Sequence, residues 1–296
     1  MSYTNAPEVD LARIVTTASG ILLNLSLRRA GALTRGSPMS RRPAQPHDAG
    51  RTSRATGTDP LEIISLSFGL FPEITALNDR FLPRQRRLKL TLDVNLDARA
   101  EGRTPASFME GLDRICPSLS RHLCCGDNRI QETFFRAGRR PSCAMREADD
   151  AVDIAHLLEH LVIDFQHFIA DMRVCSGVTC CHRSPVHRCD VFIESPDERV
   201  SRLSVTLACN LMNGLLTGAP ADPSCARIVR LARHVYRSPG AALTPCSAKA
   251  ALDGDEQYLS VLLSLTELGF IREVETSMNF SGMPLYSLSA IDPGGS

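Results

Sequence analysis

The amino-acid sequence predicts an α+β fold, in which a small mixed sheet packs on two long helices and a C-terminal winged helix follows. Three patterns indicate this fold. Leucines alternate with polar residues over 87–97, which is the period of a half-buried strand. Apolar residues recur at helical spacing over 151–172 and again over 197–215. Near the C-terminus, three helical segments precede two strand-like segments.

Composition divides the 296 residues into three predicted parts. Residues 1–58 contain eight Arg, no Lys and three acidic residues among many Ser, Pro and Gly, which predicts a disordered tail, or a true start codon further along the chain. Residues 59–220 form the predicted α+β domain, and 221–296 the winged-helix-like domain.

The net charge is zero and no apolar run is long enough for a membrane span, so we expect neither a general affinity for nucleic acid nor a membrane protein. Eleven cysteines without a convincing secretion signal predict a cytoplasmic protein with reduced thiols.

The remaining elements follow from local signals along the chain. Pro117 closes a predicted helix over 106–119, and Asp197 opens a second long helix, since negative charge is favourable at a helix N-terminus. Gly269 is typical of a helix C-terminus. The other predicted elements are a strand over 190–194, helices over 225–237, 244–252 and 256–270, and strands over 270–277 and 284–289.

The candidate site is the sequence HLLEH within 151–172. On a helix, His156 and His160 lie one turn apart on the same face, and Glu159 lies beside them. This is the H-x-x-E-H order of the inverted zincins. Two such imidazoles can bind one Zn²⁺, and the carboxylate between them is placed to take a proton from a metal-bound water. His167, two turns further on, is more typical of a rim or core histidine than of a ligand.

The order of elements resembles the N-terminal domain of cyanophycin synthetases. The resemblance covers about 88–216, and its most specific parts are the E-H-x-x-x-[DE]-x-Q run over 159–166 and the sequence VFIE before a charged helix start. It implies a domain that handles the polymer and, in some members, cuts it at a metal-dependent hydrolytic site. The chain has no G-x-x-x-x-G-K-[ST] loop and no ATP-using ligase domains, which excludes a synthetase. It departs from the family between Cys175 and Cys189, where Cys and His replace a Gly- and Lys-containing segment.

A catalytic zinc site needs a third protein ligand. The resemblance favours Glu194, at the end of the VFIE strand, and Glu198 and His187 are the alternatives. A structural zinc site in the Cys- and His-rich segment 175–189 is less favoured, because that segment lacks paired C-x-x-C knuckles.

We therefore expect a zinc-dependent, metallopeptidase-like hydrolase that acts on a peptide or isopeptide-type amide, with Glu159 as general base and His156, His160 and Glu194 as metal ligands. The main alternative is a non-catalytic regulatory or ligand-binding protein whose winged helix contacts a partner or a second copy of the chain. A transcription factor that contacts DNA through its Arg-rich tail is a third hypothesis. DNA binding by 221–296 is not expected, because that part has six basic and eight acidic residues, a net charge of −2.

Overall fold

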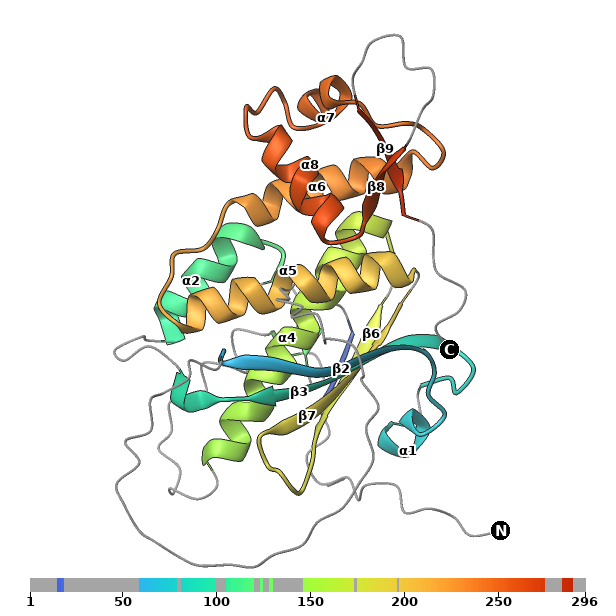
Figure 1. Ribbon diagram of the computed structural model, residues 1–296. Coiled ribbons are helices and arrows are strands. Elements are labelled where there is room, and N and C mark those ends of the chain that lie inside the picture. Colours follow the sequence, from blue (N-terminus) through green and yellow to red (C-terminus); the bar gives the residue numbers. More distant parts are fainter. Residues whose placement is uncertain are drawn as a thin grey trace, which may run out of the picture.

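The computed structural model describes residues 15–18, 59–78, 81–98, 105–119, 123–124, 128–129, 146–172, 175–195, 197–274 and 284–289. The fold is α+β, as predicted. Figure 1 shows a curved sheet with the two long helices beside it, and the C-terminal elements, in orange and red, gathered beyond the second of these helices. The layers are therefore sheet, long helices and C-terminal module.

The strands form two sheets. The larger sheet has the order β2-β3-β7-β6-β1-β4-β5, and each of its pairings is antiparallel, where mixed pairing was expected. The smaller sheet pairs β8 with β9. The strands are β1 (Val15–Ala18), β2 (Leu61–Leu70), β3 (Arg86–Val94), β4 (Leu123–Cys124), β5 (Asn128–Arg129), β6 (Ser176–Cys181), β7 (Arg188–Glu194), β8 (Ile271–Val274) and β9 (Leu285–Leu288).

The helices match the predicted ones closely, and α1 is an addition. They are α1 (Ile74–Leu77), α2 (Pro105–Ile115), α4 (Arg146–Ala170), α5 (Glu198–Leu216), α6 (Ser224–Arg237), α7 (Pro245–Ala251) and α8 (Tyr258–Glu267), with a 3₁₀ turn, η2 (Leu96–Ala98). Asp197 is the N-cap of α5, and its side chain accepts a hydrogen bond from the backbone N–H of Arg199 (2.8 Å). Gly269 follows α8 with φ +68°, a conformation that glycine adopts without strain.

The two faces of the larger sheet differ. The alternating leucines of β3, Leu88, Leu90 and Leu92, are buried in the main core with the long helices, which confirms the predicted half-buried strand. The opposite face carries a smaller apolar cluster, in which Phe192 of β7 and Val178 of β6 pack with residues of the α1 segment. Strands β6 and β7 are therefore covered on both faces.

Strand β1 lies in the part of the chain that was predicted to be a disordered tail. It pairs with β6 on one side and β4 on the other. Val15, Thr16 and Thr17 are β-branched, which suits a strand. The rest of the predicted tail lies outside the described residues.

The C-terminal part has the predicted order of three helices and a strand pair. Leu243 and Tyr286 add an isolated bridge to this small sheet. The assignment to the winged-helix class stays a prediction. In the part of the chain that the structure describes, no helix combines the length and apolarity needed to cross a membrane.

Candidate functional site

Three polar side chains of the HLLEH sequence are buried in the core. The exposed fractions are 1% for His156 and 0% for both Glu159 and His160. They come from the middle of α4, which packs against β6, β7 and α5. Burying ionisable groups costs several kcal/mol unless they are paired or neutral, so these residues need a physical reason to be there.

The two histidines form a close pair. Their ring centroids lie 4.8 Å apart and the ring planes are tilted by 45°. Burial lowers the pKa of His156 to about 3, which keeps its imidazole neutral at physiological pH. Neutral imidazoles are the form that binds metal ions. The two rings therefore lie close enough to be two ligands of one metal ion, and His156 is in the protonation state that metal binding needs.

Glu159 faces strand β6. Its Oε2 accepts a hydrogen bond from Thr179 Oγ1 (2.5 Å). Gly177, two residues earlier on the same strand face, leaves space for the carboxylate, because a Cβ atom at Gly177 would lie 2.6 Å from Glu159 Oε1. Gly177 and Thr179 were not identified from the sequence, since strand β6 was not predicted.

The structure does not bring Glu194 to the histidines. Gly177 and Ile193 are cross-strand partners on the α4 face of the sheet, and Glu194 follows Ile193, so its side chain lies on the opposite face. There its Oε1 lies 3.7 Å from Arg87 Nη2, and its Oε2 accepts a hydrogen bond from the backbone N–H of Ser176 (3.2 Å). Arg87 is fully buried and lies over the ring of Phe81. Glu194 is thus the counter-ion of a buried arginine.

The two alternative ligands have other partners as well. Glu198 forms an ion pair with Arg202, one turn further along α5 (2.6 Å). His187 is half exposed, and its Nε2 lies 3.8 Å from Asp93 Oδ2. Among the described residues, no group of three or more His, Cys, Asp and Glu side chains could hold a metal ion.

The cysteines of 175–189 are divided between the two faces of the hairpin formed by β6 and β7. Cys181 and Cys189 are cross-strand partners in the main core, where Cys175 also lies, whereas Cys180 packs in the smaller cluster on the other face. His182 lies 3.4 Å from Asp190. The thiols of this segment therefore point to both sides of the hairpin.

The last residue of the E-H-x-x-x-[DE]-x-Q run joins the two long helices. Gln166 is fully buried, and its Oε1 accepts a hydrogen bond from Ser201 Oγ of α5 (3.0 Å). One turn from His160 on the same helix, Asp164 accepts a hydrogen bond from Ser118 Oγ, just after α2. His167 is exposed. The run therefore has a structural role at its C-terminal end and a candidate chemical role at its N-terminal end.

Comparisons with known proteins give no match, either to protein families, to curated proteins or to solved structures.

Proposed function

We propose that the protein is a metal-dependent hydrolase that acts on a peptide or isopeptide-type amide, with His156 and His160 as two of the ligands of a Zn²⁺ ion. The observation that supports this most is the burial of two neighbouring histidines beside a carboxylate in the middle of α4, with His156 held neutral by its burial. A shared metal ion would compensate the cost of placing these groups in the core.

Glu159 is the proposed general base. Bound zinc would polarise the scissile carbonyl and lower the pKa of its water. Glu159 would accept the proton, and the hydrogen bond from Thr179 Oγ1 would hold its carboxylate in one orientation. Space at Gly177 permits this orientation. The third protein ligand stays open, because Glu194 is engaged with Arg87.

The test measures metal content and hydrolysis together in the purified full chain. Wild type is expected to hold about one zinc per chain. His160→Gln, which keeps the size of the side chain roughly similar, should lose both the metal and hydrolysis. Glu159→Gln should keep the metal and lose hydrolysis of a peptide and isopeptide panel by 10²–10⁴-fold, the usual range for a general base.

His167→Ala is the matched control, since His167 lies on the same helix but is exposed. It should change neither quantity. Circular dichroism confirms that each variant is folded before its metal is measured. Metal content that is equal in His160→Gln and wild type would contradict the proposal and direct attention to the Cys- and His-rich hairpin.

A second candidate is a non-catalytic regulatory or ligand-binding protein. Two observations favour it. Leu259 and Leu263 of α8 are 52% and 59% exposed, one turn apart on a helix without Lys or Arg, which suits contact with a protein partner or a homodimer. A cavity also lies where α5 meets α6 and α8. A folded wild-type protein without metal and without activity on the panel would favour this candidate.

A further inference from the structure

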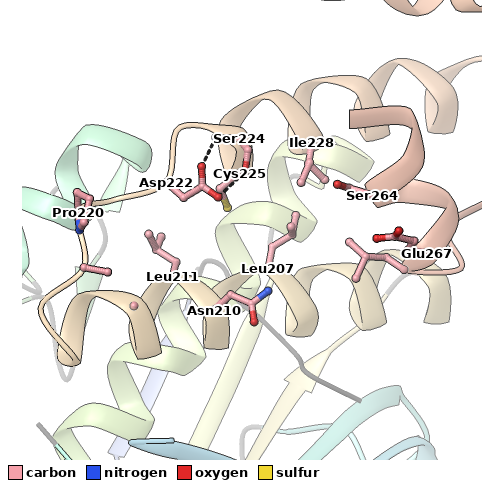
Figure 2. Close-up of a pocket in the computed structure, with 13 residues that line it drawn as sticks. Leu207, Asn210, Leu211, Pro220, Asp222, Ser224, Cys225, Ile228, Ser264 and Glu267 are labelled. Carbon is pink, nitrogen blue, oxygen red and sulfur yellow. Dashed lines mark hydrogen bonds between the residues drawn. The ribbon is translucent and has the colours of Figure 1, made fainter. Parts of the chain in front are cut away.

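A cavity of about 430 Å³ lies between α5, α6 and α8, where the α+β domain meets the C-terminal module (Figure 2). Its volume is in the range of small-molecule sites. It is separate from the HLLEH residues, none of which lines it. A ligand bound there would contact both parts of the chain.

Part of the cavity wall is aliphatic, and the polar residues Asn210 and Ser264 also line it. Leu207 and Leu211 come from α5 and Ile228 from α6, and each keeps about 5% of its surface exposed. These side chains are part of the main core, so they form a fixed surface. An alkyl chain that covers them would be removed from water at a gain of roughly 25 cal/mol per Å².

The charged residues that line the cavity are both acidic, Asp222 and Glu267. Figure 2 shows them apart from one another, with Leu207 and Ile228 between them in this view. Asp222 is held in place, because its carboxylate accepts hydrogen bonds from the backbone N–H (2.8 Å) and the hydroxyl (2.6 Å) of Ser224. Glu267 is exposed and has no ion-pair partner among the described residues.

Among the described residues, no cation forms an ion pair with either carboxylate. The lining contains no Lys, Arg or His. Two nearby arginines of α6 have other partners: Arg227 Nε lies 2.5 Å from Asp255 Oδ2, and Arg230 Nη2 lies 2.5 Å from Asp253 Oδ2. The cavity therefore offers an aliphatic surface on part of its wall and two separated negative charges.

We propose that this cavity binds a linear aliphatic diamine. Each ammonium group would lie near one carboxylate, and the methylene chain would cover the leucine and isoleucine side chains between them. This inference does not depend on the proposed hydrolase activity, since it uses none of the same residues.

Binding is tested with 1,6-diaminohexane on the full chain, by isothermal titration calorimetry at low salt. Two probes of the same chain length, hexylamine and 1,6-hexanediol, serve as references. The diamine is expected to bind several-fold more tightly than hexylamine, and the diol more weakly than either. Exposed ion pairs contribute modestly to affinity, so Glu267→Gln should weaken diamine binding by about two- to five-fold and weaken hexylamine binding less.

A filling variant tests the location. Gly214 lines the cavity, and the nearest atom to a Cβ placed there is Ala219 Cβ at 3.8 Å. Gly214→Leu should therefore fold and should abolish diamine binding. Gly214→Ala, which adds one methyl group, and Glu273→Gln, an exposed carboxylate on β8 away from the lining, are the controls that should retain it.

The proposal is overturned if the diol binds as tightly as the diamine, because the carboxylates would then contribute nothing. It is also overturned if Gly214→Leu, shown to be folded by circular dichroism, binds the diamine like wild type. A diamine that does not bind wild type at all overturns it as well. Each of these results leaves the metal measurement on His160→Gln unaffected.

Discussion

The carboxylate of Glu159 depends on two residues of β6 for its place in the core. Thr179 donates a hydrogen bond to one oxygen, and Gly177 provides the space beside the other. The spacing of HLLEH predicted which α4 residues share a face, because helical periodicity is local. It could not predict Gly177 or Thr179, because their position opposite the helix depends on how β6 pairs with β7 and β1.

Gly177→Ala should therefore destabilise the protein. The added Cβ would lie 2.6 Å from Glu159 Oε1, and overpacking of this kind typically costs about 1–3 kcal/mol. Gly69→Ala in β2 is the matched control, since a Cβ there meets no atom within 4 Å and alanine is slightly better than glycine in a strand. Urea unfolding measures the free energy of unfolding of both variants. In a Glu159→Ala background the cost of Gly177→Ala should shrink, and an unchanged cost would show that the clash is not with the carboxylate.

At the scale of elements, α5 connects the other layers: it packs on α4, on α2 and on β2. Two glycines within these helices differ in how closely the neighbouring helix packs against them. A Cβ at Gly111 of α2 would lie 2.5 Å from Leu215 Cδ2 of α5, whereas Gly214 of α5 has open space beside it. Intrinsic helix propensity predicts the same gain in stability when either glycine is replaced by alanine. Any difference in stability between the two variants therefore comes from packing between the helices.

We expect Gly214→Ala to stabilise the protein by about 0.5–1 kcal/mol, the usual difference between glycine and alanine inside a helix. Gly111→Ala should show less stabilisation or a net loss, because the fully packed Leu215 side chain must shift. Thermal and urea unfolding of the two variants compare them directly. Equal stabilisation at both positions would mean that α2 and α5 do not meet closely.

The long helices and several strands could be predicted from the sequence, whereas other strands could not. Strand β2 shifts register between Ile63 and Ser65, and such a bulge breaks the alternation that identifies a half-buried strand. Strand β6 is buried on both faces and therefore does not alternate. The predicted third ligand, Glu194, lies away from the histidines for a related reason, since the face on which its side chain lies follows from strand register, which a sequence resemblance does not give.

At the scale of the whole molecule, the C-terminal module is attached to the α+β domain through α6 and α4. Arg233 lies 4.4 Å from the ring centroid of Phe168, and both Arg233 and Arg237 form ion pairs with Asp171, just after α4. With the pairs formed by Arg227 and Arg230, every arginine of α6 has an acidic partner within the protein. Arg233 and Arg237 thus connect the module to the end of α4, whereas Arg227 and Arg230 pair within the module.

This arrangement leads to a prediction about DNA. Non-specific DNA binding is almost wholly electrostatic. In the predicted winged helix, α8 is the helix that would enter the groove, and it contains no Lys or Arg. Residues 59–296 contain 25 basic residues (33 in the chain less eight) and 30 acidic residues (33 less three), so positive charge is concentrated in 1–58.

We expect any binding of the full chain to a labelled duplex at low salt to vanish when the eight arginines of 1–58 are replaced by glutamine. Replacing Arg227 and Arg272 instead should leave it unchanged. Fluorescence anisotropy with a salt titration measures both variants. Micromolar binding that persists without the tail arginines and weakens steeply with salt would instead assign DNA recognition to the C-terminal module.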